Sequence, residues 1–478
     1  MPVHIPILRA GEAYESLETA AVTDPRSGQV LAEVSLANAG LIRRDLRRIG
    51  EAGAGLRQFS CEQLLSICRE AGELFLHGEL AVGDGSAKQS PQGYVQVLSA
   101  TSGLPHVLCR KNMAKIHTSL TQMDAILRGL TRGLDLGVID DGVGEAAGVP
   151  VSLITTTEAV GVILPSNSPG VNSIWLPAVA LKMPVVLKPG RDEPWTPLRI
   201  IAALVAAGYP AEAIGFYPAD HDGADAVASE CGRSILFGDD TTMARYANNP
   251  NVQIHGTGRS KVVIGEDMID AWPQLMDVLV SSVLDNGGRS CINASCIIAP
   301  RHGDEIAEAL AARLGAVRPR KADDDEACLS AFTNDKFAQF IDGAIERGLS
   351  QEPGAEDVTA RHRDGPRKVM FEGLTYLLPT IVRCGSFDHG LANTEFMFPY
   401  ASVVQMSSAE ALARMGPTLV ATVITEDAEL ADRFVRCSSI DRLNLGPTPT
   451  SRVDWDQPHE GNLFEFLYRR RAISKVAV

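Results

Sequence analysis

From about residue 150 onward, short apolar segments alternate with segments of helical periodicity. Residues 159–165 and 184–189 are apolar runs apart from one lysine, which is typical of strands buried on both faces of a sheet. Such alternation predicts a parallel sheet covered by helices, so the expected fold class is α/β. Sheets of this kind bind ligands at the carboxyl ends of their strands. Further strands are expected at residues 213–219, 234–238, 252–255, 261–265, 400–405 and 419–425.

A chain of 478 residues is too long for one hydrophobic core, and two or three domains are expected. Residues 1–145 are mostly helical in pattern, with a polar loop at 83–94, and a later helix is expected to open at Thr196-Pro197.

Composition narrows the class of protein. The net charge of −15 argues against nucleic acid as a partner, because phosphate binding needs clustered cations. No uninterrupted apolar run is long enough to span a membrane. The nine cysteines are scattered, which indicates a reduced, cytoplasmic protein. Cys291 and Cys296 are not joined by a second pair or a histidine cluster, so no metal site is expected.

Cys291 is the strongest candidate for chemistry. A helix is expected at 270–284, the Gly287-Gly288 pair ends it, and a strand follows at 294–300. The cysteine therefore lies in a glycine-bordered loop, where backbone N–H groups and Arg289 would lower the pKa of the thiol and make it a nucleophile. The alternative is a small buried hydrophobic residue, which is the usual role of cysteine.

Motifs in a fixed order resemble the aldehyde dehydrogenase superfamily over roughly residues 155–445. They are Pro165-Ser166-Asn167, Lys188-Pro189 before a Thr-Pro helix start, the loop Asn286 to Ala294, Glu395 to Pro399, and the segment Leu419 to Asn444. The resemblance implies a Rossmann-type cofactor domain at 1–256 with part of 445–460, and an α/β catalytic domain with Cys291 at 257–444. It also implies a small arm of oligomerisation strands at about 146–158 and 463–478. It also implies a homodimer or homotetramer that acts on a small aldehyde or acyl-CoA.

The resemblance also implies a mechanism. The thiolate of Cys291 attacks the aldehyde, NAD or NADP takes the hydride, and water or coenzyme A releases the acyl group. Asn167 and the backbone N–H of Cys291 would bind the oxyanion. Lys188 and Glu395 would bind cofactor riboses, although Asn167 alone fits a turn and Glu395 alone fits a surface carboxylate at a helix start. Further candidates for cofactor contact are Pro165, Gly238 and Gly258.

The chain departs from the family at the general base. Hydrolytic members carry a glutamate about thirty-odd residues before the cysteine, but residues 253–261 contain none. Hydrolysis of a thioester needs a base near the water, whereas coenzyme A brings its own thiol. The departure therefore favours the branch that interconverts acyl-CoA and aldehyde. His255 is the alternative base for a hydrolytic enzyme, and Thr257 also falls near; His255 can equally be the end of a strand.

The cofactor and the activity itself have alternatives. Arg191 would pair with the 2′-phosphate of NADP; Glu193 could instead bind a ribose, or Arg191 could be a surface residue. Asp239 and Asp240 at a helix start would repel a pyrophosphate. Other function classes are a cofactor-independent esterase or thioesterase and a catalytically silent relative. The sequence at Pro447 to Thr450 lacks the family's usual loop, so the substrate is not implied.

Overall fold

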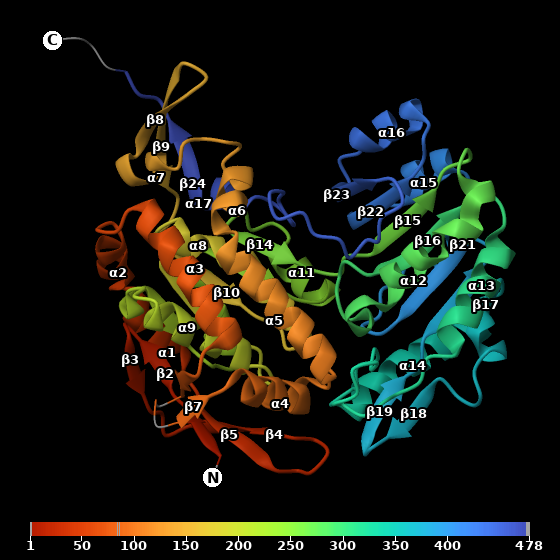
Figure 1. Ribbon diagram of the computed structural model, residues 1–478, viewed down its shortest axis with the longest axis horizontal. Coiled ribbons are helices and arrows are strands. Elements are labelled where there is room, and N and C mark those ends of the chain that lie inside the picture. Colours follow the sequence, from red (N-terminus) through yellow and green to blue (C-terminus); the bar gives the residue numbers. More distant parts are fainter. Residues whose placement is uncertain (1, 84, 86, 475–478) are drawn as a thin grey trace. The chain divides into compact units, whose positions relative to one another are not determined.

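The computed structural model describes residues 2–83, 85 and 87–474, and it divides into two compact units (Figure 1). The first unit comprises Met1–Thr101, Cys109–Gly256 and Asp454–Val478, and the second comprises Ser102–Leu108 and Thr257–Val453. The chain therefore passes from the first unit to the second between Gly256 and Thr257. In both units helices cover a mixed sheet of seven strands, so the α/β prediction is confirmed.

The main sheet of the first unit has five parallel strands, and two further strands extend one side through antiparallel pairing. In spatial order these are β14 (Val252–His255), β13 (Gly232–Phe237), β10 (Ala159–Ile163), β11 (Val185–Lys188), β12 (Ile214–Phe216), β2 (Ile7–Arg9) and β3 (Glu12–Tyr14). The five residues of β10 are all buried, which is the burial that the apolar run predicts for a central parallel strand.

Helices surround this sheet, and smaller sheets flank it. The helices are α1 (Ala39–Leu46), α2 (Ile49–Leu56), α3 (Cys61–His77), α4 (Pro91–Ser102), α5 (His106–Thr121), α6 (Met123–Leu130), α7 (Gly137–Asp141), α8 (Pro177–Ala180), α9 (Trp195–Ala206), α10 (His221–Glu230), α11 (Asp240–Tyr246) and α17 (Leu463–Leu467). The other strands are β1 (Val3–Ile5), β4 (Thr19–Thr23), β5 (Val30–Ser35), β6 (Leu80–Val82), β7 (Ala87–Gln89), β8 (Val143–Ala146), β9 (Val149–Thr155) and β24 (Tyr468–Arg471).

The sheet of the second unit runs in the order β17-β20-β21-β16-β15-β22-β23, and only β17 is antiparallel. Its strands and a separate hairpin are β15 (Ser260–Ile264), β16 (Ala294–Ala299), β17 (Ala355–Asp357), β18 (Lys368–Phe371), β19 (Leu374–Leu377), β20 (Thr380–Cys384), β21 (Tyr400–Gln405), β22 (Thr418–Ile424) and β23 (Ile440–Leu445). Its helices are α12 (Met276–Leu284), α13 (Gly303–Gly315), α14 (Asp335–Gln351), α15 (Ser408–Arg414) and α16 (Ala428–Val435).

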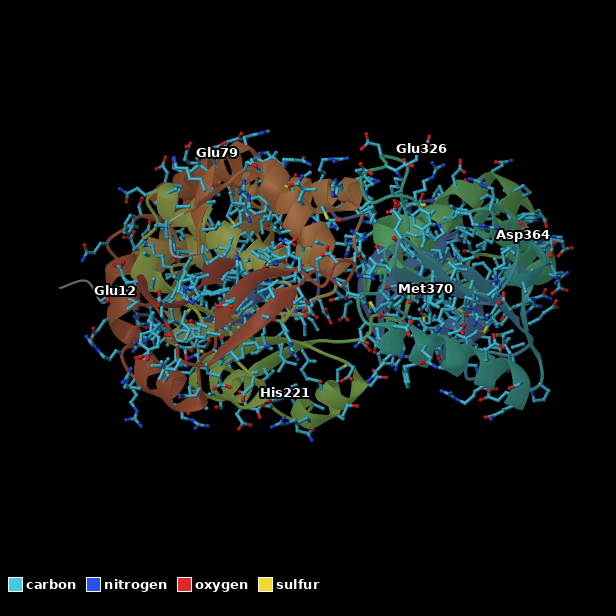
Figure 2. All side chains as sticks on the ribbon, turned by 90° about the horizontal axis from the view of Figure 1, so that it is seen from below. Glu12, Glu79, His221, Glu326, Asp364 and Met370 are labelled. Carbon is cyan, nitrogen blue, oxygen red and sulfur yellow. The ribbon has the colours of Figure 1, made fainter. Side chains whose placement is uncertain are left out.

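The second sheet is packed on both faces. Val262 and Ile264 of β15 belong to the core that contains residues of α12 and α13. Val263, between them, belongs to the core on the other face, with residues of α14, α15 and α16. Alternate residues of one strand therefore enter two separate cores. The β18–β19 hairpin is paired with neither sheet's strands, and its Met370 is exposed (Figure 2).

The predicted helical character of residues 1–145 is wrong at the N-terminus, where five short strands occupy much of residues 3–35. These strands are three to six residues long, too short for their alternation to stand out. The predicted loop at 83–94 also contains β7 and the start of α4. The predicted strand at 464–478 is partly helix α17 before β24, and residues 475–478 lie outside the described residues.

Another boundary shifts at a proline. Residues Ile269–Leu275 form a 3-10 helix that contains Pro273, and the α-helix begins only at Met276. Proline has no N–H to donate and restricts the preceding residue, so the regular helix starts after it. In the arm, β9 pairs antiparallel with β24, and Thr155 lies opposite Tyr468. Among the described residues, no helix combines the length and the hydropathy needed to cross a bilayer.

Candidate functional site

The candidate residues of the first unit lie along one edge of its parallel sheet. Lys188 is the last residue of β11 and is paired in register with Ile163 of β10. His255 is the last residue of β14 and is paired with Phe237 of β13. Pro165 and Asn167 follow β10, and Gly238 follows β13. These are the carboxyl ends of neighbouring parallel strands, where such sheets bind ligands.

Lys188 presents a partly buried cation at this edge. Burial lowers the pKa of its ammonium, and the carboxylate of Asp220 opposes that shift. Beside it, Gly190 packs so closely on the backbone that a Cβ would lie 2.5 Å from the carbonyl oxygen of Pro165. Arg191 is exposed. An ammonium and an exposed guanidinium suit hydroxyl and phosphate oxygens, so this edge fits a nucleotide cofactor.

Glu193 corrects two predictions. Its Oε1 accepts hydrogen bonds from the backbone N and the Oγ1 of Thr196, at 2.8 and 2.7 Å. The helix α9 therefore begins at Trp195, and Glu193, rather than Thr196, supplies the capping oxygen. The side chain is buried, which raises its pKa to about 8, although the bonds from Thr196 oppose the shift. Glu193 is thus held inside the protein and is not placed to bind a ribose.

The start of α11 is occupied by a side chain of the protein itself. The carboxylate of Asp239 accepts from the backbone N and the Oγ1 of Thr242, both at 2.9 Å. These bonds lower the pKa of Asp239, so the carboxylate is ionised at neutral pH. The carboxylate therefore already occupies a backbone N–H at the start of this short helix, and the predicted conflict with a pyrophosphate stays a prediction. Gly238 is required here by packing, since a Cβ would lie 2.5 Å from Thr242.

His255 is buried and oriented by a carboxylate. Its Nδ1 lies 2.5 Å from Oε2 of Glu460, and its ring stacks on Phe237 with centroids 4.9 Å apart. Its Nε2 is shielded from solvent and has no hydrogen-bond partner among the described residues. A carboxylate on Nδ1 fixes the tautomer that leaves Nε2 as an acceptor. The residue does end a strand, and it also has the arrangement of a carboxylate-oriented base.

Cys291 lies at the amino end of its sheet, which differs from the carboxyl-end location expected from parallel sheets in general. Its loop precedes β16, which begins at Ala294. Asn286, Gly287 and Gly288 all have positive φ, at 53°, 65° and 68°, and this left-handed run reverses the chain after α12. The turn is completed where Oδ1 of Asn293 accepts from the backbone N of Ser290 at 2.9 Å.

Arg289 anchors the loop that carries Cys291, and its predicted effect on the pKa of the thiol stays a prediction. The side chain is buried, its guanidinium lies 5.3 Å from the ring centre of Phe332, and it donates to the carbonyls of Ser102 and Ala331. Burial lowers its pKa to about 10. The guanidinium fastens the loop to the core of the second unit. The thiol of Cys291 is half-buried beside Ile292, Leu419 and Val420, a mainly apolar cluster.

Glycines interlock three segments of the second unit. A Cβ on Gly288 would lie 2.3 Å from the backbone N of Pro399, and a Cβ on Gly258 would lie 2.0 Å from the carbonyl oxygen of Cys291. No residue with a side chain fits at either place without movement of the backbone. The Cys291 loop therefore rests on residues 398–399 and on residue 258. Gly258 has this packing role, and its predicted contact with a cofactor stays a prediction.

Glu395 lies in an irregular segment, so the alternative of a surface carboxylate at a helix start is wrong. Its Oε2 accepts from the backbone N of Arg259 at 2.7 Å. Burial raises its pKa to about 7, although hydrogen bonds from the backbone of Arg259 and Gly258 oppose the shift. Its Oε1 is shielded from solvent and accepts no hydrogen bond from the described residues. A buried acceptor without a donor fits a hydroxyl group of a bound cofactor.

Sequence reasoning did not single out three residues that act on Glu395 or His255, namely Arg259, Lys261 and Glu460. Lys261 had a recognisable signal, because a lysine within the otherwise apolar run 260–264 needs a partner when that strand is buried. Glu460 had none, since it lies 205 residues from His255. Among the described residues, no group of three or more histidine, cysteine, aspartate or glutamate side chains is placed to hold a metal ion.

Comparison with known proteins identifies the relatives of this chain. Residues 148–462 match the family model described as Aldehyde dehydrogenase family. An aminoacetaldehyde dehydrogenase of Pseudomonas aeruginosa is 26% identical in an alignment of 388 residues that covers 72% of this chain and 72% of that protein. A malonate-semialdehyde dehydrogenase of Bacillus thuringiensis is 22% identical in an alignment of 428 residues that covers 83% of this chain and 79% of that protein. Among solved structures, the indole-3-acetaldehyde dehydrogenase AldA of P. syringae, a mutant in complex with NAD+ and IAA, has a TM-score of 0.76 at 18% identity and covers 98% of this chain and 96% of its own.

Proposed function

Because the chain belongs to the aldehyde dehydrogenase family, we propose that it oxidises an aldehyde with NAD or NADP through a covalent intermediate on Cys291. The observation that carries the proposal is the placement of this half-buried thiol in a loop that glycines lock onto two other segments. A nucleophile that is already held in one orientation loses little entropy when it reacts. We assign cofactor binding to the first unit and catalysis to the second.

In the proposed reaction the Sγ of Cys291, as thiolate, bonds to the aldehyde carbon, and the carbonyl oxygen becomes an oxyanion. The backbone N–H of Cys291 and the amide of Asn167 are the proposed donors to that oxygen. NAD or NADP, when bound, supplies the acceptor for the hydride that leaves this carbon. The acyl group then remains on Cys291 as a thioester, and its transfer to an acceptor regenerates the thiol.

We infer that the acyl acceptor is water and that His255 is the base. Glu460 holds Nδ1 at 2.5 Å, and the shielded Nε2 has no donor among the described residues. This is the arrangement in which imidazole takes a proton from water and its charge is then stabilised by the carboxylate.

Coenzyme A is the second candidate acceptor. Residues 253–261 contain no glutamate, and a thiol substrate needs less help from a base than water does. If coenzyme A is the acceptor, the enzyme interconverts acyl-CoA and aldehyde, and His255 is a structural residue that closes β14 against Glu460. The two candidates differ in one requirement, which is turnover without coenzyme A.

For the cofactor, Lys188 and Glu395 are the proposed ligands of ribose hydroxyls. Pro165 is a further proposed contact, because it follows β10, whose Ile163 is paired with Lys188. Arg191 is the proposed partner of the 2′-phosphate of NADP, because it is exposed at the same edge as Lys188. The buried Glu193 offers no competing acceptor for the 2′-hydroxyl of NAD. We therefore propose NADP as the preferred cofactor.

For assembly, we propose a homodimer or homotetramer formed through the arm β24-β9-β8. This three-stranded sheet has two edges, and the residues of β24 after Tyr468 are exposed. An exposed strand edge is a template for pairing with another chain. The cytoplasmic location also stays a proposal that rests on the scattered cysteines. Sedimentation of the protein with and without residues 468–474 tests the assembly.

The test of the reaction is an absorbance assay of the reduced cofactor. Purified protein is mixed with NAD or NADP and a panel of aldehydes, with and without coenzyme A. Turnover without coenzyme A supports hydrolysis, and turnover only with it assigns the acylating reaction. Cys291→Ala must abolish turnover; equal activity in this variant would mean that another group is the nucleophile. Two further assays, hydrolysis of p-nitrophenyl acetate without cofactor and binding of NADP, address the other function classes. A cofactor-independent esterase hydrolyses the ester and does not bind NADP, whereas a silent relative does not hydrolyse it.

A further inference from the structure

Arg259 has a strained backbone. Its φ is +44°, in the left-handed region that residues other than glycine avoid at a cost of about 1–2 kcal/mol. The residue lies directly before β15, between Gly258 and Ser260, and both of these neighbours contact the carbonyl of Cys291. Gly258 packs against the carbonyl oxygen, and Oγ of Ser260 donates to it at 2.8 Å. The conformation of Arg259 therefore decides whether both contacts form.

Opposite charges hold the two ends of this residue. The carboxylate of Glu395 accepts from the backbone N–H of Arg259 at 2.7 Å. The ammonium of Lys261 donates to the carbonyl oxygen of Arg259 at 2.6 Å and to Oγ1 of Thr418 at 3.0 Å. Hydrogen bonds to ionised groups are roughly twice as strong as those between neutral groups. Two such bonds are of the size needed to offset the strain.

An irregularity in the sheet accompanies the position of Lys261, from which its ammonium bonds to the carbonyl of Arg259. Ser260 is opposite Ala294, but Lys261 is opposite Cys296, so the register shifts between the two residues. A bulge of this kind re-aims a side chain, and here it accompanies a lysine that is fully buried. Burial lowers the pKa of Lys261 to about 8, while Cys296 and Glu395 oppose the shift and Arg259 adds to it. A buried lysine is costly unless its ammonium is bonded.

We propose that Glu395 and Lys261 are positioning residues for Cys291, which they hold in place by clamping the peptide groups of Arg259. The inference rests on the proposed function only in naming Cys291 as the nucleophile. It is separate from the proposed cofactor contact of Glu395, because the clamp uses Oε2 and leaves Oε1 for a ligand. The charged groups that act on Glu395 are Arg259 and Lys261.

The experiment measures alkylation of Cys291 by iodoacetamide, with the modified site identified by mass spectrometry. Neither aldehyde nor cofactor is present, so the clamp is tested even if the chain fails to oxidise any aldehyde. Glu395→Gln keeps the size and one acceptor oxygen but removes the charge. We expect it to slow alkylation of Cys291 about tenfold at pH 8, a free energy of about 1.4 kcal/mol, and at most about twofold at pH 6 because the wild-type clamp is then protonated.

The decisive comparison uses the strain itself. Glycine adopts positive φ without penalty, so in an Arg259→Gly background the clamp is not needed, and we expect Glu395→Gln to have no effect. In an Arg259→Ala background the strain remains, and the tenfold effect is expected to remain. Lys261→Met is expected to act like Glu395→Gln at pH 7. An equal effect of Glu395→Gln in the glycine and alanine backgrounds, or none in the wild type, overturns the proposal.

Controls separate the clamp from general damage. Glu266→Gln removes another carboxylate that accepts a backbone N–H, from Ser408 at 2.8 Å, and is expected to leave alkylation of Cys291 unchanged. Alkylation of the half-exposed Cys328 and Cys437 is measured in the same sample as an internal reference. If Glu395→Gln changes the alkylation of Cys291, Cys328 and Cys437 together, the variant has lost its fold. The proposal is then decided by comparing Arg259→Gly with and without the Glu395→Gln substitution. In that background, equal labelling with and without the Glu395→Gln substitution supports the clamp, and an unequal result refutes it.

Discussion

A single methyl group at residue 258 is expected to displace the nucleophile. The Cβ of alanine at Gly258 would lie 2.0 Å from the carbonyl oxygen of Cys291 and 2.8 Å from its carbonyl carbon. Ordinary contacts of a Cβ begin at about 3.4 Å, so the two segments must separate by roughly 1.4 Å, and overpacking of this kind costs about 1–3 kcal/mol. Misplacement of a reacting group by about 1 Å lowers a rate on the order of a hundredfold.

Gly258→Ala is therefore predicted to lower kcat/KM about a hundredfold, which corresponds to about 2.7 kcal/mol of activation free energy, and to slow alkylation of Cys291. The assay is steady-state oxidation of the best aldehyde of the panel, with the melting temperature measured in parallel. Gly385→Ala is the matched control in the same unit, because its Cβ would meet its nearest atom at an ordinary 3.4 Å. Wild-type kcat/KM in Gly258→Ala would show that the backbone at 258 does not hold the cysteine loop.

Other predictions concern separate groups. His255→Asn and Glu460→Gln should lower turnover without coenzyme A by about a hundredfold while alkylation of Cys291 stays unchanged, and an unchanged rate would return the assignment to coenzyme A. Arg191→Ala should raise KM for NADP about tenfold and leave KM for NAD unaltered, whereas equal changes would remove its role in cofactor choice. Burial raises the pKa of Glu193 to about 8 in the folded protein, so folding favours the protonated carboxyl. The contribution of this group to the free energy of unfolding is complete below about pH 4.5 and is lost as the pH rises to 8. Glu193→Gln has no titrating carboxyl at this position, so its free energy of unfolding, measured by urea titration at pH 5 and 8, should lack this decline. In the wild type the decline is on the order of 4 kcal/mol or less. The same change in the free energy of unfolding between pH 5 and 8 in both proteins would contradict the assignment.

The buried carboxylates illustrate one design of this protein. Glu193 and Glu395 both have raised pKa values because of burial, and both accept backbone N–H groups. Glu193 starts a helix and has both of its recorded donors in Thr196. Glu395 keeps one oxygen without a donor among the described residues. The proposed role of Glu395 in cofactor binding rests on that acceptor.

The sequence alone determined the fold class and the family. Apolar runs that alternate with helical periodicity required parallel sheets, and the strands at 252–255 and 400–405 have the bounds that were predicted. The positions of Cys291, Lys188 and Glu395 followed from motifs of a few adjacent residues. Local patterns of this kind are legible because strand burial, turn chemistry and helix starts depend on neighbours in the chain.

Only the tertiary structure decided how those residues are held. The orientation of His255 depends on Glu460, and the clamp on Arg259 depends on Glu395, 136 residues away. Only the fold shows that Arg289 is buried against Phe332 and donates to the carbonyls of Ser102 and Ala331. Glu193 was one alternative for a ribose ligand, but its carboxyl accepts from the backbone N of Thr196 at the start of α9. Hydrogen bonds between distant segments leave no pattern in the sequence, because any residue of suitable chemistry can supply the partner once the fold brings it within about 3 Å.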